Sequence, residues 1–84
     1  MNRYLVMVMR KPAFDVSLIE PHRQFLAELR AAGRIELSGG FSDKSGGAYL
    51  LRAVSLEEAT SITQRDPLHL AQASQVTLYE WSAT

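Results

Sequence analysis

The sequence predicts a small α+β domain in which strands and helices follow one another in the order β-α-β-β-α-β. Short apolar runs rich in β-branched and aromatic residues alternate with segments whose apolar residues recur at helical spacing. Proline or glycine separates most of these segments. With 84 residues, the chain is long enough for one hydrophobic core and too short for two. We therefore expect residues 1–84 to form a single domain.

The first half of the chain begins with a strand and a helix. Residues 3–10 are an apolar run rich in strand-forming residues. The helix that follows has two possible starts. Ser17 and Glu20 have the spacing of a capping box, whereas Glu20 as the cap would place Pro21 in the first turn, where its missing N–H is not needed. Gly33 is expected to end this helix.

The second half contains a hairpin, a second helix and a last strand. Most of the glycines lie between the two hairpin strands, so a turn is expected there. Ser55 and Glu58 form a capping box, and Asp66-Pro67 ends the second helix because the residue before proline avoids the helical conformation. The expected ranges are residues 34–38 (strand), 39–47 (loop), 48–54 (strand), 56–65 (helix), 67–73 (turn or short helix) and 74–81 (strand).

This element order is that of the ferredoxin-like βαββαβ arrangement, a four-stranded antiparallel sheet with both helices on one face. Such a sheet normally alternates apolar and polar residues, because only one of its faces is covered. Here both faces are apolar: in the first strand Tyr4 and Val6 point to one side, and Leu5 and Met7 point to the other. A few exposed apolar side chains are normal, but three strands share this pattern. We therefore expect a homodimer in which a second copy covers the open sheet face.

Composition and charge exclude several classes of function. Nine Lys and Arg residues balance nine Asp and Glu residues, which argues against a nucleic-acid partner and against adsorption to anionic membranes. No apolar stretch approaches the roughly 20 residues of a membrane span. The absence of cysteine excludes disulfides, thiolate metal ligands and cysteine nucleophiles, and it favours a cytoplasmic location.

Polar side chains from three separate segments meet at one edge of the expected sheet. His22 lies at the start of the first helix, Ser38 at the end of the second strand and Asp66 at the end of the second helix. Because successive elements alternate in direction, all three reach the same edge. An aspartate beside a histidine fixes the tautomer of the imidazole, as a general acid/base requires. We therefore predict that these residues are catalytic; a purely structural His–Asp pair and a serine that only caps the loop are the alternatives.

Further residues at this edge are candidates for substrate binding. Arg10 ends the first strand there and would attract a negatively charged substrate, or else pair with a surface carboxylate. The backbone N–H groups of Gly39 and Gly40 would bind an oxygen, and Phe41 would line a pocket or fold back on the core. The glycines match no phosphate-binding fingerprint. The histidines and the scattered carboxylates lack the spacing of metal ligands, so no metal site is expected.

Several short segments occur together in an order and spacing that are moderately specific. They are Tyr4-Leu5-Val6-Met7, Pro21-His22-Arg23-Gln24-Phe25-Leu26, Ala32-Gly33, Leu37-Ser38-Gly39, Gly47-Ala48-Tyr49-Leu50-Leu51, Ser55-Leu56-Glu57-Glu58-Ala59, Asp66-Pro67 and the closing Trp81. In the order and spacing of these segments, the chain resembles the YCII-related (YciI-like) family over nearly the whole length of the chain. The resemblance implies a ferredoxin-like fold paired into a dimeric α+β barrel, with an active-site histidine and aspartate at His22 and Asp66 and a serine similar to Ser38. The family commonly has Gly-Pro after the second strand, where this chain has Gly39-Gly40. Because of this difference near the expected pocket, the resemblance does not imply that this chain shares a substrate with the family.

One branch of that family eliminates HCl from chlorinated hydroxyhydroquinones, a reaction that needs proton transfer and no cofactor. The resemblance therefore favours a cofactor-free, lyase-like enzyme that acts on a small cyclic organic acid or phenol through its His–Asp pair. The alternative is a non-catalytic dimeric module that binds a small molecule in the same pocket. A cofactor-free oxygenase of the same architecture is a third hypothesis, based on fold analogy alone.

Overall fold

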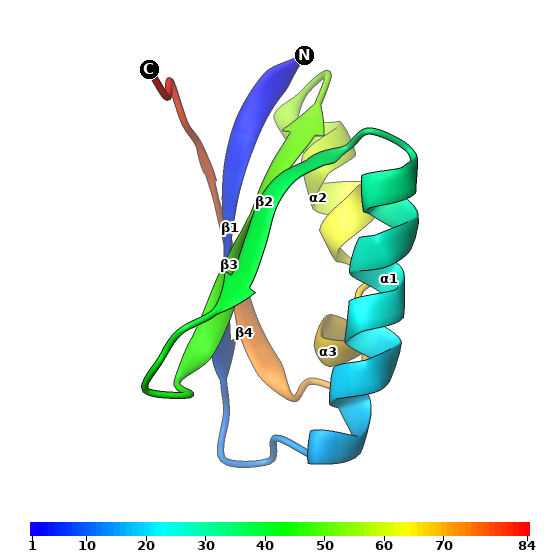
Figure 1. Ribbon diagram of the computed structural model, residues 1–84, viewed down its shortest axis with the longest axis vertical. Coiled ribbons are helices and arrows are strands. Elements are labelled where there is room, and N and C mark those ends of the chain that lie inside the picture. The colour runs from blue at the N-terminus through cyan, green and yellow to red at the C-terminus, as the bar shows by residue number, and fades with distance from the viewer.

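The computed structural model describes residues 1–84 as a four-stranded antiparallel sheet with three helices on one face (Figure 1). The strand order is β2-β3-β1-β4. The elements are β1 (Asn2–Arg10), the 3-10 turn η1 (Val16–Leu18), α1 (Ile19–Ala31), β2 (Ile35–Gly40), β3 (Gly46–Ala53), α2 (Leu56–Thr63), α3 (Pro67–Leu70) and β4 (Ser74–Glu80). This confirms the ferredoxin-like α+β prediction, because both neighbours of the central strand β1 run antiparallel to it.

The start of α1 differs from the capping box expected at Ser17. The Asp15 carboxylate accepts a hydrogen bond from the Ser17 amide at 2.9 Å and so caps the 3-10 turn η1. The helix then begins at Ile19, with Leu18 as its N-cap and no side-chain cap. Pro21 lies in the first turn as the second alternative placed it, but the expected cap at Glu20 is wrong, because Glu20 is already part of the helix. In the expected capping box, the Glu20 carboxylate would accept a hydrogen bond from the Ser17 amide. That expectation was wrong because the Asp15 carboxylate accepts from this amide instead.

The hairpin is tighter than the expected loop over residues 39–47. Gly39 pairs with Ala48 and Gly40 with Gly47, so both strands continue through the glycines and only residues 41–45 connect them. A Cβ atom at Gly47 would lie 2.6 Å from the Gly39 carbonyl oxygen, whereas one at Gly39 would meet nothing within 4 Å. Gly47 therefore permits the close approach of the two strands.

Replacing Gly47 by alanine is expected to lower the free energy of unfolding by about 2 kcal/mol, because the new methyl group overlaps backbone that cannot rotate away. Urea unfolding measures the change. Gly39→Ala is the matched control and is expected to stay within about 0.5 kcal/mol of the parent. Equal stability of the two variants would contradict the close approach seen at Gly47.

The two faces of the sheet have different surroundings. On the helix side, Tyr4, Val6 and Val8 of β1 are buried in the core, together with Leu51 of β3. On the outer side, which no helix covers in Figure 1, the β1 side chains are only partly buried and Leu37 is 69% exposed. The apolar outer face anticipated from the sequence is therefore present in the structure.

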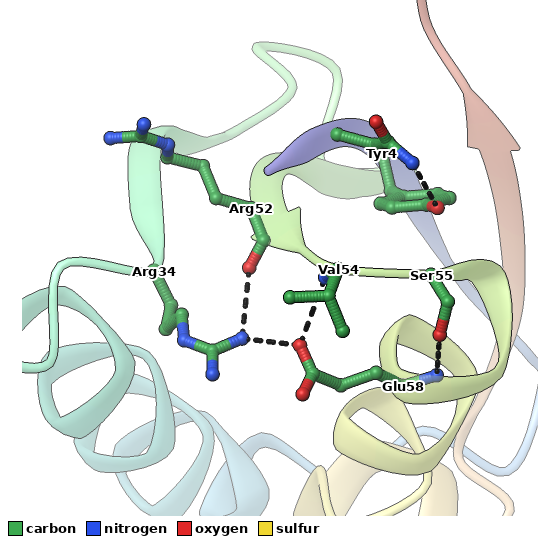
Figure 2. A network of polar contacts seen from close by, with 7 residues as sticks. Tyr4, Arg34, Arg52, Val54, Ser55 and Glu58 are labelled. Carbon is green, nitrogen blue, oxygen red and sulfur yellow. Dashed lines mark hydrogen bonds and ion pairs between the residues drawn. The ribbon is translucent and has the colours of Figure 1, made fainter.

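A polar network joins the connection between α1 and β2 to β3 and α2, at the end of the sheet where the chain termini lie (Figures 1 and 2). Arg34 donates to the Glu58 carboxylate and to the Arg52 carbonyl, and the Val54 amide donates to the same carboxylate. Ser55 accepts from the Glu58 amide at 3.1 Å, which confirms the predicted start of α2. Arg34 first and the Val54 amide second hold the pKa of Glu58 below its ordinary value.

The network predicts a specific dependence of stability on pH. Because the pKa of Glu58 is lower in the folded than in the unfolded chain, its stabilising contribution is present above about pH 4.5 and is lost as the pH falls through the folded value. Glu58→Gln is expected to lower stability at pH 7 and to weaken the loss of stability on acidification. Thermal melts from pH 3 to pH 7 check this, with the exposed neighbour Glu57→Gln as control. Identical pH profiles for parent and Glu58→Gln would contradict the assignment.

Candidate functional site

A hydrogen-bonded His–Asp pair lies at the end of the sheet opposite the chain termini. The His22 Nδ1 atom is 2.8 Å from Asp66 Oδ1. His22 comes from the start of α1, whereas Asp66 is the N-cap of α3, where its Oδ1 also accepts from the Leu68 amide at 2.9 Å. The Asp66-Pro67 step suits this position, since proline at the first helical position needs no hydrogen-bond partner for nitrogen. The structure thus brings together two residues 44 positions apart in the chain.

The burial of the pair defines its chemistry. The Asp66 side chain is fully buried, whereas the His22 side chain is 17% exposed. A carboxylate can only accept, so neutral His22 carries its proton on Nδ1 and presents Nε2 as an acceptor. This is the arrangement in which an imidazole takes up a proton at Nε2 while the aspartate stabilises the resulting cation.

A cavity of about 350 Å³ lies beside this pair, between α1 and the adjoining end of the sheet. Its lining includes His22 and four residues proposed from the sequence as site residues: Arg10, Ser38, Gly39 and Gly40. Because the glycines add no side chain, backbone forms part of the wall and leaves room for a ligand. Residues that were widely separated in the sequence therefore share one cavity.

Phe41 is the exception among the predicted residues. It lies in the hairpin connection, is 37% exposed and does not line the cavity. Phe14 supplies an aromatic wall instead, and the Arg10 guanidinium stacks 4.2 Å from the centroid of its ring. Arg10 is thus held by an aromatic ring and not by a surface carboxylate.

Sequence reasoning missed two further arginines, one in the cavity lining and one that contacts a lining residue. Arg30 donates to the Ser38 hydroxyl at 2.6 Å, and Arg23 lines the cavity. Arg30 is two helical turns after His22, so helical spacing from the histidine could have identified it. None of the ion pairs in the structure involves Arg10, Arg23 or Arg30. The cavity lining thus contains two arginines and no carboxylate, which favours an anionic ligand.

Tyr49 and Ser74 also line the cavity and were not predicted as site residues. Both are buried, and neither hydroxyl has a hydrogen-bond partner. Burial, and secondarily the charge of Asp66, raise the pKa of the Tyr49 hydroxyl above its ordinary value. Tyr49 consequently remains a neutral hydrogen-bond donor.

No group of three or more His, Cys, Asp or Glu side chains is arranged to hold a metal ion. None of the helices has the length and apolar character needed to cross a membrane.

Comparison with known proteins gives concordant results. The family model of the YCII-related domain matches residues 2–82. An uncharacterized Bacillus subtilis protein, YjpA, is 42% identical over 81 residues, which cover 96% of this chain and 95% of the relative. The fold is similar to that of 5-chloro-2-hydroxyhydroquinone dehydrochlorinase (TftG) from Burkholderia phenoliruptrix AC1100 in complex with 2,5-dihydroxybenzoquinone. The TM-score is 0.76 at 21% identity, over 98% of this chain and 95% of the other.

Proposed function

Because the chain belongs to the YCII-related domain family, we propose that it is a cofactor-free enzyme acting on a small cyclic organic acid or phenol. The observation that carries this proposal is the 2.8 Å contact between His22 and Asp66 at the wall of a cavity that is also lined by Arg10 and Arg23. Acid–base chemistry by two side chains needs no cofactor. The absence of cysteine supports a cytoplasmic location as part of the same proposal.

In this proposal each site residue has a distinct role. His22 takes up or delivers the proton at Nε2, and Asp66 orients the imidazole and stabilises its protonated form. Arg10 attracts the negative charge of the substrate, and the Ser38 hydroxyl, held by Arg30, binds one of its oxygens. The Phe41 amide donates to the Gly46 carbonyl. In an antiparallel ladder every second residue of an edge strand points its amide away from its neighbour, so the Gly40 amide is unpaired. In this proposal it donates to the substrate oxygen that Ser38 binds.

The reaction class that suits these groups is a lyase-type elimination. In a keto tautomer of the ring, one hydroxyl proton has moved to the chlorine-bearing carbon. The histidine then removes the proton of a second ring hydroxyl, the O–H electron pair forms a C=O bond, the adjoining ring double bond shifts to the chlorine-bearing carbon, and chloride leaves with the electrons of the C–Cl bond. The balance needs no oxidant or reductant. The similarity of fold to a dehydrochlorinase supports this choice. The arginines at the cavity would complement the negative charge of an ionised hydroxyquinone.

The proposal is tested by measuring chloride release from 5-chloro-2-hydroxyhydroquinone by the purified protein. Release that is faster than in buffer and saturates with substrate is expected. In parallel, the ¹⁵N chemical shifts of the His22 ring are expected to show the proton on Nδ1. A protein that binds the ring without releasing chloride would instead be a non-catalytic binding module.

We also propose that the chain forms a homodimer through the outer face of the sheet. Leu5, Met7 and Met9 of β1 lie on this face, with Leu37 and Tyr79 exposed on neighbouring strands. A contiguous apolar face that no helix covers needs a partner, and an identical face is self-complementary under two-fold symmetry.

The dimer makes a direct prediction. Met7→Lys, at the middle of the outer face, is expected to convert a dimer into a monomer, because it would place two charges in an apolar interface. Light scattering coupled to size-exclusion chromatography measures the mass. Val16→Lys, which changes an apolar residue that is 72% exposed in η1, is expected to leave the dimer intact. A monomeric parent protein would contradict the proposal.

A further inference from the structure

Two buried hydroxyls of the cavity wall have no role in the chemistry proposed above. Tyr49 is 2% exposed and Ser74 is 3% exposed, and neither hydroxyl oxygen has a hydrogen-bond partner. Buried polar groups are nearly always partnered, because leaving one unpaired costs free energy. Both residues line the cavity, so a ligand there could supply the missing partner.

The sheet register places these hydroxyl residues beside the residues of the cavity mouth. Tyr49 pairs with Ser38, and Ser74 pairs with Arg10, so each pair lies on the same face of neighbouring strands. Ser38 and Arg10 are exposed, whereas Tyr49 and Ser74 are buried. The exposed residues therefore form the mouth of the cavity, and the hydroxyl residues form its inner wall.

The surroundings of Tyr49 define what it can bind. Asp66 Oδ2 is also buried without a partner, and its charge acts on the Tyr49 hydroxyl. A group that ionises only with difficulty next to a carboxylate stays protonated, and it can donate a hydrogen bond to an oxygen. Carbonyl, hydroxyl and phenolate oxygens of a ring are suitable acceptors.

We infer that Tyr49 is a further ligand-binding residue, whose hydroxyl donates a hydrogen bond to an oxygen substituent of the ligand ring at the inner wall. Arg10 and Ser38 bind another oxygen substituent of the same ring at the mouth. Ser74 provides a second hydroxyl on the same wall. This inference rests on the proposed function and narrows its substrate class to rings that carry oxygens on more than one edge. A ring with a single acidic group would bind Arg10 and Ser38 at the mouth and leave the Tyr49 and Ser74 hydroxyls without a hydrogen-bond partner.

Tyr49→Phe tests the inference because it removes only the hydroxyl. The probe is 2,5-dihydroxybenzoquinone, a ring with oxygens on opposite edges, and its affinity is measured by isothermal titration calorimetry. The affinity is expected to fall about five- to tenfold, as loss of one hydrogen bond predicts. The melting temperature is expected to stay the same or rise, since no hydrogen bond within the protein is lost.

Tyr4→Phe is the matched control. Tyr4, labelled in Figure 2, is also fully buried, but it lies at the far end of the sheet. Its hydroxyl donates to Glu80 at 3.2 Å and accepts from Asn2. This variant is expected to bind the quinone like the parent and to melt at a lower temperature. The two variants therefore remove the same atom with opposite expected effects on binding and stability.

The outcomes separate this inference from the proposed function. Weaker quinone binding by Tyr49→Phe and unchanged binding by Tyr4→Phe would support it, and a smaller loss in Ser74→Ala would add the second hydroxyl. Equal affinity of Tyr49→Phe and the parent would overturn the inference while leaving the chloride-release assay unaffected. A parent protein that neither binds the quinone nor releases chloride would overturn both.

Discussion

Replacing His22 by asparagine is expected to lower the rate of chloride release by about 10²–10⁴-fold, the range lost with a positioned general base. The asparagine amide can occupy the place of the Nδ1–H group and donate to Asp66, but it has no equivalent of Nε2. The fold should therefore persist while the proton acceptor is lost. Initial rates with 5-chloro-2-hydroxyhydroquinone measure the effect.

The other histidine of the chain provides the control. His69 is exposed on α3 and makes no side-chain hydrogen bond, so His69→Asn is expected to retain the parental rate. A His22→Asn variant that is folded and releases chloride at the parental rate would show that the imidazole is structural. The His–Asp pair would then be a satisfied core contact, as the alternative reading of the sequence holds.

Replacing Asp66 by alanine is expected to affect stability and activity together. The variant loses the N-cap of α3 and the partner of His22, and it leaves the buried Leu68 amide without an acceptor. We expect a loss of about 2–3 kcal/mol in the free energy of unfolding, together with a large fall in chloride release. Urea unfolding and the chloride assay measure the two effects separately.

Asp66→Asn separates the cap from the charge. Asparagine caps helices as well as aspartate does, so most of the stability should return. The rate should stay low, because a neutral amide does not stabilise a protonated imidazole as a carboxylate does. An asparagine variant with the parental rate would show that Asp66 acts only as a helix cap.

The fold was predictable from local signals that tertiary packing did not override. The capping box at Ser55, the Asp66-Pro67 step and the two apolar faces of β1 each predicted what the structure shows. The failures were local as well. At Ser17 an aspartate two residues earlier captured the amide, and at Gly39 a strand continued through glycines that a composition rule assigns to a loop.

The candidate site was only partly predictable. His22, Asp66 and Ser38 follow from topology, because alternating elements bring their ends to one edge of the sheet. Arg30 was missed because it is exposed and lies two helical turns after His22 on α1. Only the structure shows that its side chain reaches across to Ser38 on β2. Tyr49 was missed because a tyrosine in an apolar strand has the pattern of a core residue, and only the structure shows that its hydroxyl has no partner.

The central position of β1 in the sheet has a consequence for biosynthesis. This first strand pairs with β3 on one side and with β4 on the other, and Tyr4 lies opposite Glu80. Such non-local pairing slows folding, because the closure of long loops precedes most stabilising contacts. On the ribosome, β1 waits with both apolar faces unpaired and prone to aggregate until its later partners emerge. Folding to the native sheet is therefore expected only after β4 has left the exit tunnel.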